Sequence, residues 1–138
     1  MNIRGAMRTF LVLASGIPSL LGAPENIFVS RVPPGTQRRY VVLHSPGGDP
    51  AHMHLGGPAA FGTPLVQVEC WADTMEGVEE LADAVDAGLN GYRGAMGDLW
   101  VHACVRRDRR GPLLEDRQDG SADPIYSVQL DYVVSHRT

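Results

Sequence analysis

The stretch TPLVQVECWADTMEGVEELADAVDAGLNGY, residues 63–92, changes its hydrophobic period halfway along and so decides the fold. Over residues 63–73 apolar and polar side chains alternate, which predicts a half-buried antiparallel strand. The residues expected to face the core are Val66, Val68, Cys70 and Ala72. From Asp73 onward the apolar residues recur at helical spacing and predict an amphipathic helix. Its buried stripe is Val78, Leu81, Ala82, Val85 and Leu89.

Both ends of this helix carry residues that such ends favour. Asp73 or Thr74 can cap the first turn, and Asp73 with Glu76 has the spacing of a capping box. Asn90-Gly91 supplies a left-handed stop. The other side of the helix is acidic, with no lysine or arginine opposite, so we expect a solvated face or a contact with a basic partner. This acidic face consists of Glu76, Glu79, Glu80, Asp83 and Asp86.

Four further segments predict strands. They cover residues 26–32, 38–45, 99–107 and 124–136. In the last two, strict alternation turns one set of side chains toward the helices. That set is Leu99, Val101, Ala103, Val105, Tyr126, Val128, Leu130, Tyr132 and Val134. The same alternation places Cys104 on the opposite face from Cys70, so we expect no disulfide between them.

The apolar run near the start is too short and too interrupted for a secretory signal. The spacing of its apolar residues instead predicts an amphipathic helix over residues 3–15. Its core-facing side is Met7, Phe10, Leu11 and Ala14. Residues 1–138 then form a single α+β domain with the element order α-β-β-β-α-β-β. We expect an antiparallel sheet of about four to five strands with both helices packed on one face.

The composition argues against several classes of protein. A hydrophobic fraction of 43% and a charged fraction of 20% are those of an ordinary globular domain. The net charge of -4 argues against a nucleic-acid binder, which needs clustered cations. No apolar run reaches the roughly 18 residues that a membrane span requires, so no membrane contact is expected.

A long loop is predicted over residues 46–62, since neither a helix nor a strand tolerates so many glycines and prolines. It carries His52 and His54, a pair that suggests half of a metal site. A zinc site needs a third and usually a fourth ligand. The remaining nitrogen and sulfur donors do not converge, because Cys70 and Cys104 are turned to different faces. We therefore expect no metal and no cofactor.

The sequence contains no catalytic motif. Ser45 adjoins His44, but neighbours on a strand point to opposite faces and cannot act as nucleophile and base. The glycine-rich loop lacks the lysine and the following helix that a phosphate site requires. We therefore predict a protein that is not an enzyme.

A charged hairpin arm is predicted over residues 106–123. Its basic residues are Arg106, Arg107, Arg109 and Arg110. Acidic residues nearly neutralise the arm, which argues against a nucleic-acid patch and favours ion pairs between subunits. The expected targets in a neighbouring subunit are Glu79, Glu80 and Asp83 of the acidic helix.

Two tryptophans are predicted on the side of the sheet that faces away from the helices. Trp71 and Trp100 are large apolar side chains on an otherwise polar face. Such residues usually mark contacts, so we expect them to form one apolar patch covered by a neighbouring subunit or by the charged arm.

Three short motifs stand out in the predicted helix and strands. They are V-x-V-x-x-W-A at residues 66–72, L-x-G-Y-x-G at 89–94 and L-D-Y-x-V at 130–134. Together with SGIPSLLG at 15–22, they resemble the tail completion family, the tail terminator proteins of long-tailed (siphovirus-type) phages and gene transfer agents. The resemblance covers nearly the whole chain, and its motifs are mostly core-facing.

The resemblance implies a structural role without bond chemistry. Such proteins form a hexameric ring on the last ring of the tail tube, stop its polymerisation and offer a surface to the head connector. The implied partners are other copies of the chain, the major tail tube protein and the connector or stopper protein. DNA would pass through the lumen without specific binding, and an acidic chain suits such a passage. The implied location is the head–tail junction of the virion, after assembly in the host cytoplasm.

Two alternatives stay open. One is a head-completion protein (a stopper or adaptor), which is also a ring component. The other is a small metal-dependent hydrolase that uses His52 and His54. Elemental analysis would separate the enzyme from the ring proteins. The neighbouring genes would separate the two ring proteins, since a terminator gene should lie immediately before the tail tube gene.

Because His52 and His54 lack convergent partners, we expect chelators and added zinc to leave the melting temperature unchanged. Thermal unfolding with and without zinc measures this directly. A metal-dependent rise in melting temperature that disappears in His52→Ala would contradict the prediction.

Overall fold

The strand and the helix predicted from residues 63–92 are both present. The computed structural model describes residues 3–14, 16–21, 26–33, 39–44, 61–62, 65–115 and 125–137. In it, β4 spans Leu65–Ala72 with every second residue buried, and α2 spans Met75–Leu89 with its predicted stripe fully buried. Thr74 caps α2, since its Oγ1 accepts a hydrogen bond from Gly77 N at 2.9 Å. Gly91, with φ of 85°, ends the helix as predicted.

The strands form one sheet, and its order differs from a simple meander. The other strands are β1 (Ile27–Val29), β2 (Tyr40–His44), β3 (Phe61–Gly62), β5 (Gly94–Met96), β6 (Leu99–Glu115) and β7 (Ile125–Arg137). Their order is β1-β2-β4-β7-β6-β5, and β3 pairs with β7. The predicted α+β class is confirmed. The sheet has seven strands, however, and β1 runs parallel to β2, so the predicted strand number and fully antiparallel pairing are wrong.

The two shortest strands, β3 and β5, account for the difference in number. β5 is joined to β6 by Gly97 and Asp98, and Gly97 has the left-handed φ of 59° that such a tight turn needs. β3 lies within residues 46–62, predicted as loop, and pairs with the end of β7. The rest of that loop, with His52 and His54, lies outside the described residues.

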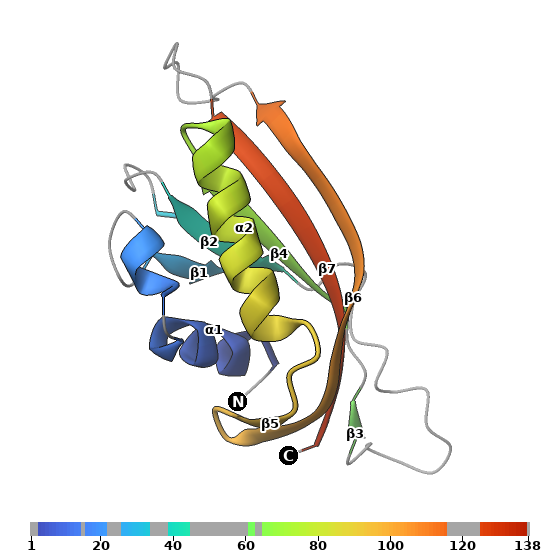
Figure 1. Cartoon of the computed structure of the whole chain (residues 1–138). Coiled ribbons are helices and arrows are strands. Elements are labelled where there is room, and N and C mark those ends of the chain that lie inside the picture. The colour runs from blue at the N-terminus through green and yellow to red at the C-terminus, as the bar shows by residue number, and fades with distance from the viewer. Residues whose placement is uncertain are drawn as a thin grey trace.

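Both helices cover the same face of the sheet (Figure 1). α2 crosses β4, β7 and β6, whereas α1 (Ile3–Leu13) lies beside β1, β2 and β5 and is followed by the short 3₁₀ helix η1 (Pro18–Leu20). Met7 and Leu11 of α1 are fully buried as predicted. Arg8 Nε donates a hydrogen bond to the Ile27 carbonyl at 2.7 Å, which fixes α1 against β1. None of the described helices is long and apolar enough to cross a membrane.

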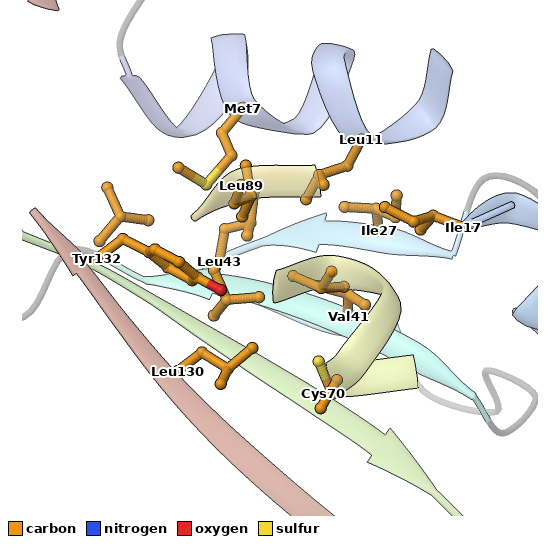
Figure 2. Close-up of a cluster of buried hydrophobic side chains, with 14 of the residues drawn as sticks. Met7, Leu11, Ile17, Ile27, Val41, Leu43, Cys70, Leu89, Leu130 and Tyr132 are labelled. Atoms are coloured by element: carbon orange, nitrogen blue, oxygen red, sulfur yellow. The ribbon is translucent and has the colours of Figure 1, made fainter. Parts of the chain in front are cut away.

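The hydrophobic core lies between the helices and the sheet, and its side chains come from several elements (Figure 2). Representative members, all fully buried, are Met7, Leu11, Leu43, Leu89, Leu130 and Tyr132. Each large apolar side chain buried in this way contributes about 1.5–3 kcal/mol relative to exposure. The position of α2 therefore depends on this contact with the inner face of the sheet.

The β6–β7 hairpin departs from the strict alternation predicted from the sequence. Residues 100–115 of β6 pair with residues 125–137 of β7, which is 16 residues against 13. The register shifts in three places, between residues 101 and 103, 106 and 108, and 110 and 113. Each shift adds one residue to β6, so the alternation between the two faces restarts one residue late.

The first of these bulges changes the core. Val101 is buried as expected, but Ala103 and Val105 are exposed and Cys104 is fully buried. The predictions for these last three residues are wrong because the bulge at residue 102 reverses the faces that follow it. The predictions for β7 are confirmed for four residues that are fully buried. These are Val128, Leu130, Tyr132 and Val134.

Gly111, in the third bulge, gives a prediction about stability. Its φ is 112°, and a Cβ added there would lie 2.6 Å from the Ser127 carbonyl oxygen. Gly91, with φ of 85° and nothing within 4 Å of such a Cβ, is the matched control. We expect Gly91→Ala to cost about 1–2 kcal/mol. Gly111→Ala should cost about 1–3 kcal/mol more, because its Cβ meets the backbone of β7.

Urea unfolding of both variants beside the wild type measures this difference in the free energy of unfolding. Equal losses in the two variants would contradict the close approach of Gly111 to β7.

Candidate assembly surface

The bulges of β6 bring two arginines to the acidic side of α2. Arg106 lies opposite Tyr132, and Arg109 lies opposite Leu130. Both of these β7 residues face the core, so the two arginines leave β6 on the helix side of the sheet. Residues three apart on a regular strand lie on opposite faces. The extra residue, Arg107, is what places both arginines on the same face.

Asp86 of α2 is at the centre of this contact. Arg106 Nη1 lies 2.9 Å from Asp86 Oδ2, and the Tyr132 hydroxyl donates a hydrogen bond to Asp86 Oδ1 at 2.7 Å. The Asp86 side chain is only 20% exposed, so water screens these interactions less than it screens surface pairs. Burial, and then the hydrogen bond to Asp86, raise the pKa of Tyr132 far above its ordinary value. The phenol therefore stays protonated and remains a donor.

The end of α2 is tied to β6 beside this carboxylate. Asn90 Oδ1 accepts a hydrogen bond from Arg106 N at 3.1 Å. Gly91 N donates to the Cys104 carbonyl at 2.7 Å. Two backbone groups of β6 thus find partners at the helix end, next to the second bulge. The helix and the hairpin are held together by polar contacts as well as by the core.

A second ion pair lies about one turn earlier on α2, where Arg109 Nη1 is 2.8 Å from Asp83 Oδ1. The Asp83 side chain is 67% exposed, so this pair contributes at most about 1 kcal/mol. The acidic face of α2 was expected to be solvated or to contact a basic partner. For Asp83 and Asp86 the basic partners are Arg109 and Arg106 of the same chain.

Arg110 lies on the other face of the hairpin and separates two like charges. Asp108 and Asp131 are directly opposite each other in the register, an arrangement that is unfavourable by itself. Arg110 Nη1 lies 3.4 Å from an oxygen of Asp108, and its Nη2 lies 3.3 Å from an oxygen of Asp131. The guanidinium therefore offsets the repulsion between the two carboxylates.

The structure divides the predicted interface residues into two sets. Arg106, Arg109 and Arg110 have ionic partners in their own chain. Arg107 and Glu80 are exposed, and neither they nor the half-buried Glu79 form an ion pair within the described part of the chain. The role of either set in subunit contacts stays a prediction.

The two tryptophans lie on the face away from the helices, but far apart. Trp71 is opposite Ser127 and Trp100 is opposite Arg137. Ten residues of β7 at about 3.3 Å each separate them by roughly 33 Å. The predicted joint patch is therefore wrong, because alternation fixes the face of a residue and not its place along the strand. Trp71 instead stacks on Tyr40, with ring centroids 6.2 Å apart.

Glu69 links a histidine and a tryptophan on this outer face. His44 Nε2 lies 3.1 Å from Glu69 Oε1, and Trp71 Nε1 donates a hydrogen bond to Glu69 Oε2 at 3.2 Å. One carboxylate thus joins β2 and β4 outside the core. Among the described residues, no three histidine, cysteine or acidic side chains are grouped so that they could hold a metal ion.

Both cysteines are buried free thiols. Cys70 is opposite Val128 and Cys104 is opposite Val134, six residues further along β7, or about 20 Å. This separation exceeds the reach of a disulfide. The predicted reason for the missing bridge, opposite faces, is wrong, because both side chains belong to the core. Burial raises the pKa of each thiol to about 12.

The Asp86–Tyr132 contact was not predicted, although the sequence contains a signal for it. Tyr132 was expected to face the core, and a buried tyrosine hydroxyl usually has a hydrogen-bond partner. Asp86 lies between Val85 and Leu89 of the buried stripe, so its side chain borders the core-facing side of the helix. An acidic residue at that border is a natural acceptor for the phenol.

Comparison with known proteins gives a match in fold alone. No protein-family model and no curated protein match the sequence. Among solved structures, the fold is similar to that of a chain in the virion of a native gene transfer agent (GTA) particle, with a TM-score of 0.65. The alignment covers 99% of this chain and 95% of that chain, at 16% sequence identity. The similarity therefore extends over nearly the whole length of both chains.

The two aspartates of α2 give a matched pair of variants. Asp86→Ala leaves Tyr132 and Arg106 without their partner, so we expect a loss of about 2–4 kcal/mol in the free energy of unfolding. Asp83→Ala removes an equal charge from an exposed pair and should cost less than about 1 kcal/mol. Urea unfolding measures both values, and similar losses in the two variants would show that Asp86 has no special role.

Proposed function

We propose that this protein is a structural component of a phage or gene transfer agent virion, and specifically a tail terminator. The observation that carries the proposal is the similarity in fold to a chain of a GTA virion over 99% of this chain. That similarity by itself supports a shared architecture. The specific role rests additionally on the sequence motifs that resemble the tail completion family.

The places of these motifs in the structure support the resemblance. V-x-V-x-x-W-A forms β4, and L-x-G-Y-x-G forms the end of α2 and the turn after it. In that turn Tyr92 packs on Phe10 of α1, with ring centroids 4.4 Å apart. L-D-Y-x-V lies in β7 and supplies Tyr132, the partner of Asp86. All three motifs thus shape the contact between the helices and the sheet.

In this proposal the chain, as one domain, forms a hexameric ring at the head-proximal end of the tail tube. The ring ends polymerisation of the major tail tube protein and presents its other side to the connector or stopper protein of the head. DNA passes through the lumen without specific binding, which suits a chain with a net charge of -4. No bond chemistry, metal or cofactor is required. The protein acts in the virion at the head–tail junction, after assembly in the host cytoplasm.

Assembly of tail tubes in the presence of this protein tests the proposal. Purified tail tube protein from the same particle is polymerised with and without the chain, and tube lengths are measured by negative-stain electron microscopy. We expect shorter tubes with a ring at one end, because a bound terminator blocks further addition.

Unchanged tube lengths and bare ends would contradict the terminator role. Binding to isolated connector rings, without any effect on tubes, would favour the head-completion alternative. Stoichiometric metal in the purified protein, together with hydrolytic activity lost in His52→Ala, would favour the hydrolase.

A further inference from the structure

The outer edge of β6 is open over most of its length. β5 pairs with this edge only at Leu99, Trp100 and Val101. From residue 102 to 115 no strand of the described part of the chain covers it. An extended segment of this length spans about 45 Å. Open edges of this kind are normally protected or occupied by a partner.

The open part of β6 carries an unusual share of exposed apolar side chains. Val105 is 53% exposed, Leu113 42% and Leu114 63%, and the described residues include only three other large hydrophobic side chains that are classed as exposed. Val105 and Leu113 lie on the outer face, whereas Leu114 lies on the helix face. Exposed apolar groups concentrated on one element favour a contact surface.

A simple added strand does not suit this edge. The three bulges interrupt the regular spacing of backbone donors and acceptors, and Pro112 has no N–H to offer. Such features hinder pairing of an open edge with another strand. A partner therefore has to bind mainly through side chains.

Arg107 is the arginine of this edge that can pair with an acidic residue of another molecule. The other three arginines are held by aspartates of their own chain, whereas Arg107 is exposed and forms no ion pair within the described residues. It lies between Arg106 and Arg109, which face Asp86 and Asp83. The next acids of α2 are a further turn away, toward its beginning, so Arg107 is not placed to reach them in its own chain.

The beginning of α2 is complementary to this edge in its charge and in its exposed apolar side chain. Glu76 and Glu80 are exposed, and no ion pair within the described residues involves them or Glu79. Met75 beside them is 51% exposed. One surface of the chain thus offers apolar groups and a cation, and another offers an apolar group and carboxylates, and no described residue forms an ion pair with these charges. Such charge complementarity sets the register and specificity of a contact.

We infer that the outer edge of β6 in one copy of the chain binds the beginning of α2 in a second copy. Arg107 pairs with Glu76 or Glu80, while Leu114 packs against Met75. Because two different surfaces meet, the contact is head-to-tail, the arrangement that closes into a ring. This inference rests on the proposed ring and identifies its subunit contact.

Charge reversal on either surface tests the contact. Arg107→Glu and Glu80→Arg should each weaken ring assembly about ten-fold or more, because repulsion replaces attraction at every interface. Arg93→Glu is the matched control, since Arg93 is also exposed and undergoes the same change of charge. Mass photometry and negative-stain images, with and without tail tubes, measure the assembled fraction. Circular dichroism checks that each variant is folded.

Mixing the two weakened variants separates a contact between subunits from one within a chain. In an equal mixture of Arg107→Glu and Glu80→Arg, alternating subunits place opposite charges at every interface, so even-numbered rings should return. The double variant should also assemble by itself. If the pair formed within one chain, the double variant would recover and the mixture would not. The same single variants, mixture and double variant, with Glu76→Arg in place of Glu80→Arg, test the other exposed acidic residue.

The apolar part of the contact has its own control. Leu114→Asp should reduce ring assembly about ten-fold or more, whereas Leu13→Asp, at an 80% exposed position on α1, should not. This inference is wrong if rings persist in Arg107→Glu, or if Arg107→Glu recovers assembly neither with Glu80→Arg nor with Glu76→Arg. Either result leaves the proposed ring standing. A wild-type chain that forms no ring, even on tail tubes, would overturn the proposed function instead.

Discussion

The structure depends on the three extra residues that β6 contains over the length that pairs with β7. Each extra residue bends the ladder and increases its local twist, and the hairpin curves beside α2 as a result (Figure 1). The same insertions decide which side chains face the helix. They turn Cys104 into the core, release Val105 to solvent and direct Arg106 and Arg109 toward α2. The irregularities of this one strand thus decide both which of its side chains enter the core and where its arginines lie.

The polar contact at Asp86 complements the apolar packing of α2. Burial of an apolar stripe is non-directional, so it holds a helix on a sheet without fixing its rotation or its shift along the axis. A carboxylate bound by Tyr132 and Arg106 fixes both, because hydrogen bonds require defined distances and angles. The hydrogen bonds from Arg106 N to Asn90 Oδ1 and from Gly91 N to the Cys104 carbonyl also restrict the position of the helix end. Together they define one position of α2 over β6 and β7.

The sequence predicted those elements whose residues follow a regular period. β4, α2 and β7 alternate or repeat without interruption, so their buried faces were predicted correctly. The strand at residues 99–107 was predicted correctly, but its buried face only up to the first bulge, because a period of two contains no information about where an extra residue is inserted. β3 and β5 are too short to show any period. The charged residues were identified as a group, but which aspartate meets which arginine depends on those same bulges.

The burial of the two thiols has a chemical consequence. Oxidation of cysteine starts from the thiolate, and burial, which raises the pKa of each thiol to about 12, keeps the thiolate scarce at neutral pH. Cys70 and Cys104 are also shielded from oxidants by the core. Both side chains therefore stay thiols for as long as the core stays closed. Oxidation of either cysteine requires the core to open first, so it reports on unfolding of the contact between the helices and the sheet.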